Sequence, residues 1–172
     1  MIVLDKLLPP RLLRLLSRSG LPRDLVWITP SLAQSGRFET RQAAHLAGEG
    51  IGSVLDLREE EGHDRATLTR PGLHYLRLPV TDGEAPSLEQ LSRAADWVLA
   101  ETAQDRRVLV HCRLGVSRSA CLVCAVLLRM GYPLAEAYEL VKRSRPSAAF
   151  GERQLKVLQA YQETLHTSSA AS

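Results

Sequence analysis

Cys112 and Arg118 stand six residues apart in the segment 108–120, which reads V-L-V-H-C-R-L-G-V-S-R-S-A. The thiolate form of a cysteine is a nucleophile, and an arginine guanidinium binds two phosphoryl oxygens at once. Gly115 lies between them and gives the backbone the freedom to turn its amides inward. Ser119 follows the arginine, where its hydroxyl can reach the sulfur and ease its departure from phosphorus. These residue types indicate a site at which a cysteine attacks a phosphate ester.

The residues on either side indicate a strand, a tight loop and a helix. Val108–Val110 is typical of a buried strand, and residues 120–128 are apolar on every face, as in a helix buried in a core. A loop that leads into a helix N-terminus points backbone amides and the positive end of the helix dipole at one spot. We therefore expect this loop to bind a dianion and to favour the thiolate of Cys112.

The run H-C-R-L-G-V-S-R-S-A resembles the active-site signature of the cysteine-dependent protein tyrosine phosphatases, in their dual-specificity branch. The surrounding pattern agrees over residues 25–160. The resemblance implies two steps: Cys112 attacks phosphorus while an aspartic acid protonates the leaving oxygen, and water then hydrolyses the phosphocysteine. It implies neither a metal nor another cofactor. The phosphate-binding residues would be Arg113, Leu114, Gly115, Val116, Ser117 and Arg118.

His111 precedes the nucleophile. In the family that the sequence resembles, this histidine orients the loop and tunes the thiolate by hydrogen bonding. The residue pattern fits equally well a histidine that is simply hydrogen-bonded at the end of a strand.

Asp82 is our candidate for the general acid, because it lies between an expected strand and an expected helix. The acid must approach the leaving group from the side opposite the sulfur, and the dual-specificity pattern places it in such a loop. An aspartate before Gly83 is also a common turn residue. The competing carboxylates have less suitable positions in the sequence: Asp56, Glu84, Asp96 and Asp105.

Alternating apolar patterns predict a small α/β domain, with a largely parallel or mixed sheet flanked by helices and a helical C-terminal half. The expected strands are Leu25–Thr29, Ser53–Leu57, Leu73–Val80 and Val108–Val110. The expected helices are Thr40–Gly48, Leu88–Thr102, Ser117–Met130, Leu134–Ser144 and Gly151–Leu165. We expect an amphipathic segment over 1–20, a catalytic domain over 21–166 and a disordered tail over 167–172.

Composition favours one globular enzyme domain of 172 residues with a mild net charge of +3. Aromatic residues make up 5% of the chain, which disfavours binding of single-stranded nucleic acid. Three cysteines and no signal peptide predict the cytoplasm. The expected partner is a phosphorylated protein, and the oligomeric state is not predicted.

Several other features have two readings. Cys121 and Cys124 fit a buried helix, although either fits a resolving thiol for oxidised Cys112. The basic, leucine-rich residues 4–18 fit a helix docked on protein, or weak contact with a membrane surface. No metal-ligand spacing links the polar residues His45, His63, His74 and Asp64. Glu59, Glu60 and Glu61 fit a solvated turn, although a loop after a strand can reach the rim of a pocket.

The segment after Arg145-Pro146 departs from the dual-specificity pattern because it is shortened and lacks an asparagine. This departure leaves open which residues support the active-site loop. It also suggests that the chain is an atypical member of the family that it resembles. Two alternative functions stay open: a module that binds phosphoproteins without hydrolysing them, and a phosphoinositide or other lipid phosphatase. The loop interior contains only one basic residue, Arg113, which favours a phosphoprotein over a polyphosphorylated headgroup.

Overall fold

The computed structural model describes residues 21–170 of the chain, and these form a five-stranded sheet between two layers of helices. The strands are β1 (Val26–Trp27), β2 (Leu32–Ser35), β3 (Ile51–Arg58), β4 (His74–Val80) and β5 (Arg107–His111), in the order β1-β2-β5-β3-β4. Only β1 is antiparallel to its neighbour. The prediction of a small mixed sheet in an α/β fold is therefore confirmed.

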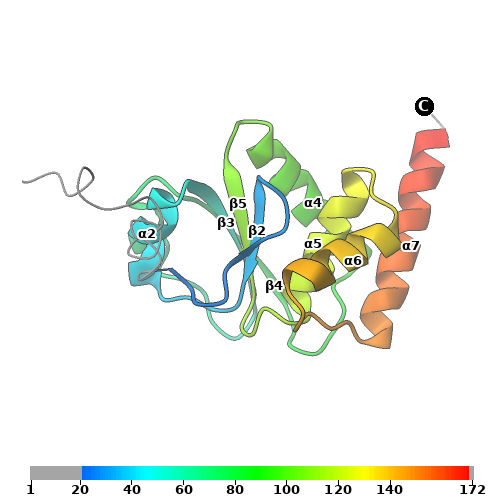
Figure 1. Cartoon of the computed structure of the whole chain (residues 1–172), viewed down its shortest axis with the longest axis horizontal. Helices are drawn as coiled ribbons and strands as arrows, with labels where there is room; N and C mark the ends of the chain where they lie inside the picture. Colours follow the sequence, from blue (N-terminus) through cyan, green and yellow to red (C-terminus); the bar gives the residue numbers. More distant parts are fainter. Residues whose placement is uncertain (1–20, 171–172) are drawn as a thin grey trace, which may run out of the picture.

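Helices cover both faces of the sheet. Figure 1 shows α2 on one side, with α4, α5, α6 and α7 on the other. The helical elements are η3 (Thr40–Gln42), α2 (Ala43–Gly48), α3 (Arg65–Thr69), α4 (Leu88–Thr102), α5 (Arg118–Arg129), α6 (Leu134–Ser144) and α7 (Glu152–Ala170). Helices α4 and α6 have the bounds expected from the sequence, and α5 begins one residue later and ends one residue earlier than expected.

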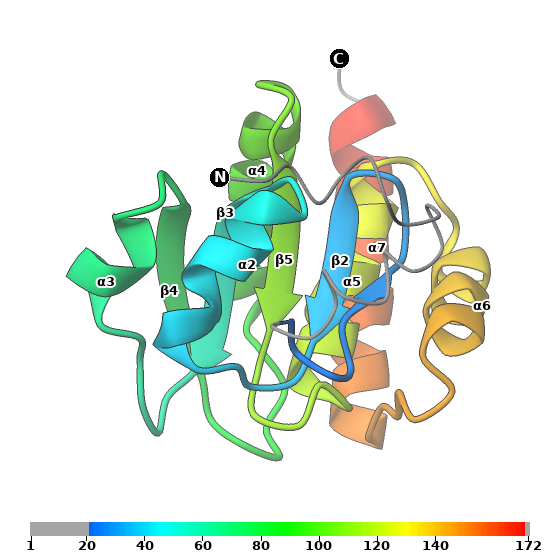
Figure 2. The same cartoon turned by 60° about the vertical axis from the view of Figure 1, so that its left-hand side comes forward.

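Two elements were not predicted. Strand β2 has the sequence LAQS, in which polar Gln34 and Ser35 are buried, so no alternation of apolar and polar residues marks it. Helix α3 has only five residues, and the Asp64 carboxylate caps it by accepting a hydrogen bond from the backbone amide of Thr67. Figure 2 shows β2 beside β5 and α3 beside the edge strand β4.

Helix α5 forms the centre of the main core. Its residues from Arg118 to Leu128 are all buried, as its apolar sequence predicted, and it contacts α4, α6 and α7. Cys121 and Cys124 are both fully buried in it. Burial raises the pKa of Cys121 to about 12 and also raises the pKa of Cys124. The prediction that these two cysteines are core residues is confirmed.

Helix α7 continues through Ala170, into the range 167–172 for which we expected a disordered tail. The expected amphipathic segment of residues 4–18 lies outside the described residues. Between residues 21 and 170, no helix is both long and apolar enough to cross a membrane.

Candidate active site

The four mutually parallel strands β2, β5, β3 and β4 end at one edge of the sheet. They end at Ser35, His111, Arg58 and Val80, and the loops that follow these residues converge there. Such an edge is where ligands bind in open α/β sheets. The expected phosphate loop, 112–117, and the expected acid loop, 81–87, both belong to this edge.

Cys112 is the first residue after β5, and it is 2% exposed. Its Sγ accepts a hydrogen bond from the Gly115 amide at 3.2 Å and lies 3.3 Å from the Ser119 Oγ. Gly115 has φ +67°, and a Cβ there would lie 2.5 Å from the Gly36 backbone nitrogen. The left-handed backbone of Gly115 therefore allows the loop to close over the sulfur and pack against β2.

Arg145 supports the outside of the same loop. Its Nη2 donates to the Leu114 carbonyl at 3.0 Å and to the Asp24 carboxylate at 2.6 Å. Further along the chain, the Ala149 amide donates to the Val116 carbonyl at 2.9 Å. The shortened segment after Arg145 therefore still holds the loop, although it lacks the asparagine of the usual pattern.

Arg118 begins α5, and its guanidinium is buried among acceptors from two other loops. Nη1 donates to Glu60 at 2.9 Å and to the Val80 carbonyl at 3.0 Å, while Nη2 donates to the second oxygen of Glu60 at 3.0 Å. The bond to Arg118 holds the pKa of Glu60 at about 2. This contact has no specific sign in the amino-acid pattern beyond the position of Glu60 in a loop that follows a strand.

Asp82 lies on the same guanidinium, with its Oδ1 3.0 Å from Arg118 Nη2 and 57% of its side chain exposed. Competing carboxylates are paired with other arginines, and Asp56 is held by Arg58 beneath the loop. Glu84 pairs with Arg153 at 2.6 Å, and Asp96 pairs with Arg129. Asp82 is therefore the candidate acid that the structure brings next to the phosphate loop.

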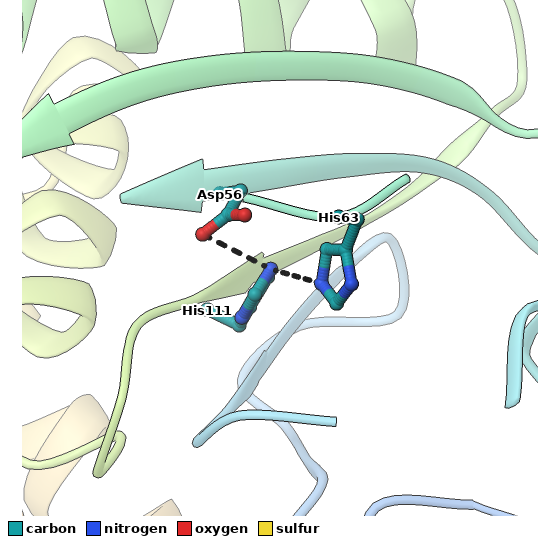
Figure 3. Close-up of side chains that lie close together, drawn as sticks. All are labelled: Asp56, His63 and His111. Atoms are coloured by element: carbon teal, nitrogen blue, oxygen red, sulfur yellow. Dashed lines mark hydrogen bonds and ion pairs between the residues drawn. The ribbon is translucent and has the colours of Figure 1, made fainter. Parts of the chain in front are cut away.

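His111 lies beneath the loop in a cluster with Asp56 and His63 (Figure 3). The two Nε2 atoms are 3.2 Å apart, and Nε2 of His111 is 3.5 Å from Oδ1 of Asp56. Burial lowers the pKa of His111 to about 3 and that of His63 to about 4. Both imidazoles are therefore neutral at neutral pH.

The donor atoms of this cluster lie within 4.8 Å of one another, a spacing that suits a metal ion. Arg58, however, donates to both carboxylate oxygens of Asp56 at 2.9 Å, and Tyr75 donates to one of them at 3.0 Å. A metal ion would have to displace that guanidinium or lie beside its charge. The cluster is better described as a hydrogen-bond network that fixes His111.

Comparison with known proteins places the chain in a family. Residues 35–164 match the family model described as dual specificity phosphatase, catalytic domain. The human dual specificity protein phosphatase 12 is 33% identical over 159 residues, which cover 90% of this chain but 47% of that protein. Human dual specificity phosphatase 28 is 32% identical over 153 residues, which cover 88% of this chain and 85% of that one.

Solved structures agree with the sequence comparison. The structure described as Tk-PTP in the active form has a TM-score of 0.77 and 29% identity, and the match covers 83% of this chain and 99% of that one. Human dual specificity phosphatase 28 has a TM-score of 0.72 and 32% identity, with 85% and 97% covered. The chain therefore belongs to the dual specificity phosphatases, as a small, atypical cysteine-based member of the protein tyrosine phosphatase superfamily.

Proposed function

We propose that this chain hydrolyses phosphotyrosine, phosphoserine or phosphothreonine in proteins through a phosphocysteine intermediate on Cys112. The observation that carries the proposal is the convergence of one nucleophile, one oxyanion site and one carboxylate. The Cys112 sulfur lies inside the loop, and the guanidinium of Arg118 adjoins the carboxylate of Asp82.

These groups and one water molecule account for every bond and proton in the reaction. The thiolate of Cys112 attacks phosphorus, and the ester oxygen leaves with a proton from Asp82. Water then attacks the phosphocysteine, Asp82 takes its proton, and the sulfur leaves as a thiolate that receives a hydrogen bond from Ser119. Arg118 and the amides of residues 113–118 stabilise the charge on the phosphoryl oxygens. His111 holds the start of the loop in place.

Arg118 must exchange one partner before it binds phosphate with two parallel bonds. Three of its five N–H groups already donate, to Glu60 and to the Val80 carbonyl, and Nη2 also forms an ion pair with Asp82. Within the described chain, its Nε–H makes no hydrogen bond. A phosphate held by Nε and Nη2 would therefore displace the Asp82 carboxylate, which becomes free to turn toward the leaving oxygen.

A groove of about 1070 Å³ beside the loop supports an extended substrate. Three arginines that line it, Arg23, Arg37 and Arg113, make no ion pair with any described residue. Such a surface suits the residues around a phosphorylated side chain, and acidic ones above all. The relatives named as protein phosphatases support the same substrate class. The three cysteines form no disulfide, which agrees with the cytoplasmic location that we propose.

The test is hydrolysis of p-nitrophenyl phosphate in the presence of EDTA, by the wild type and by Cys112→Ser. We expect turnover by the wild type and none by the variant, because a serine hydroxyl is a far weaker nucleophile than a thiolate. Binding of inorganic phosphate by Cys112→Ser serves as the control for an intact loop. A folded wild type that binds phosphate without any turnover would contradict the proposal. It would favour a module that binds phosphoproteins without hydrolysing them.

A further inference from the structure

Gln34 is a polar residue of β2 with no exposed surface, and it lies directly beneath the phosphate loop. In the parallel pairing of β2 with β5 it stands opposite Val110, two residues before the nucleophile. Its Nε2 donates to the Gly115 carbonyl at 3.0 Å and to the Ser119 Oγ at 3.2 Å. One buried amide group therefore contacts both the turn of the loop and the hydroxyl next to the sulfur.

The orientation of this amide is fixed by chemistry. The Gly115 carbonyl can only accept a hydrogen bond, so Gln34 must present its NH₂ group to it. Its Oε1 is left buried without a hydrogen-bond partner among the described residues. Because an unpaired buried acceptor destabilises the fold, a side chain selected only to fill space here would be apolar. The two donated bonds are what distinguish Gln34 from such a side chain.

These two bonds bear on where the Ser119 proton goes, because they occupy one lone pair of the Gly115 carbonyl and one of the Ser119 oxygen. A serine in a helix commonly donates to the carbonyl four residues earlier, which for Ser119 is that of Gly115. Gln34 donates to this carbonyl, and it also donates to a lone pair of the Ser119 oxygen. The Cys112 sulfur lies 3.3 Å from the same hydroxyl: as a thiol it donates to the Ser119 oxygen, and as a thiolate it can only accept. When the sulfur is a thiolate, the Ser119 proton therefore points at it.

We propose that Gln34 is a positioning residue, whose amide directs the Ser119 hydroxyl proton onto the sulfur of Cys112. The same bond then stabilises the resting thiolate and the thiolate that leaves when the phosphocysteine is hydrolysed. This inference rests on the proposed phosphocysteine mechanism and adds to it a residue from outside the loop.

The experiment compares Gln34→Met, which keeps the length of the side chain but donates no bond, with Ser119→Ala and the double variant. Gln34→Leu is a second replacement in case Gln34→Met does not fold. Ser35→Ala is the matched control, because Ser35 is also buried in β2 but its hydroxyl donates to Gly36. Two quantities are measured: the pH midpoint for alkylation of Cys112 by iodoacetamide, and the burst of nitrophenol that precedes steady turnover of p-nitrophenyl phosphate.

We expect Gln34→Met to raise the alkylation midpoint and to lower kcat about tenfold, the value of one charge-assisted hydrogen bond. Hydrolysis of the intermediate should slow more than its formation, so that the nitrophenol burst approaches one equivalent. The double variant should be no worse than Ser119→Ala, because both changes remove the same bond. Ser35→Ala should match the wild type.

Three results would overturn the inference. The first is additive losses in the double variant, and the second is an unchanged alkylation midpoint and burst in a folded Gln34 variant. The third is weaker vanadate binding by as large a factor as the loss in kcat, since that would mean the amide only supports the loop. The proposed function fails separately, if the wild type itself shows no turnover that depends on Cys112.

Discussion

The phosphate loop and the acid loop lie side by side at the same edge of the sheet but are held very differently. The phosphate loop receives bonds from β2 below, from Arg145 outside and from the segment before α7. In the acid loop, residues 81–84 are exposed, and the Asp82 side chain is paired only with Arg118 within the described structure. Several other segments therefore hold the phosphate loop, whereas a single ion pair holds the side chain of the candidate acid.

Two glycines with positive φ, one in each loop, give the sharpest test of this difference. Gly115 has φ +67° and no room for a Cβ, while Gly83 has φ +79° and nothing within 4 Å of that position. We expect Gly115→Ala to lower kcat/KM for p-nitrophenyl phosphate more than about a thousandfold, because strain and displacement combine. Gly83→Ala should cost less than about tenfold, since it adds strain alone.

Gly131→Ala is the control for strain without proximity to the site, because Gly131 has φ +94° and is equally unobstructed. It should lower thermal stability slightly and leave kcat/KM unchanged. Equal losses for Gly115→Ala and Gly83→Ala would mean that the two loops are held with the same rigidity.

Asp82→Asn should separate two effects of the Asp82 side chain: proton donation to the leaving group and the ion pair with Arg118. We expect kcat to fall about a hundredfold, because the proton donor is lost. Inorganic phosphate should inhibit at lower concentration, because the ion pair that competes for Arg118 Nη2 is removed. Initial rates and phosphate inhibition constants measure both effects. Glu84→Gln is the matched control: its carboxylate pairs with Arg153, and a larger loss there would make Glu84 the acid.

Glu60→Gln tests whether catalysis also depends on the two hydrogen bonds by which Glu60 holds the Arg118 guanidinium. A glutamine keeps one acceptor but loses the second and the charge, so we expect kcat/KM to fall about tenfold. Glu61→Gln is the neighbouring control, because Glu61 pairs with Arg58 instead. A gain in kcat/KM for Glu60→Gln would show that Glu60 competes with phosphate for the guanidinium.

The sequence predicted the parts of the site that are close together along the chain. Cys112, Ser119 and Arg118 belong to one strand-loop-helix unit, and the apolar pattern of α5 shows where that unit turns. Asp82 was chosen as the candidate acid because an expected strand and an expected helix enclose its loop, and in the structure Ser87 accepts from the Gln90 amide at the start of that helix.

The parts that the sequence did not reveal depend on contacts between distant segments. Gln34, Glu60 and Arg145 reach the site from β2, from the loop after β3 and from the end of α6. Each is a common polar residue in its local sequence, and only the order of strands brings it to the active-site edge. Burial of Gln34 in a polar strand is a tertiary effect that no local periodicity encodes.

The smallest expected effect concerns the free energy of unfolding and its dependence on pH. The cluster of His63 and His111 beneath the phosphate loop can take up protons, whereas no such network lies beneath the acid loop in the described structure. The folded state lowers the pKa of His63 to about 4 and that of His111 to about 3, below the ordinary value of 6.5. Between pH 6.5 and 4 the unfolded chain therefore binds more protons, so the free energy of unfolding falls as pH falls. The decrease is at most about 1.4 kcal/mol per pH unit for each histidine.

His63→Gln keeps a hydrogen-bonding side chain that does not titrate, so its free energy of unfolding should fall less steeply between pH 6.5 and 4.5. Urea unfolding of both proteins across this range measures the difference in slope. His45→Gln, an exposed histidine outside the cluster, should retain the wild-type slope. Identical slopes for His63→Gln and the wild type would mean that His63 is not held neutral. The two imidazoles beneath the phosphate loop would then not both stay uncharged over this pH range.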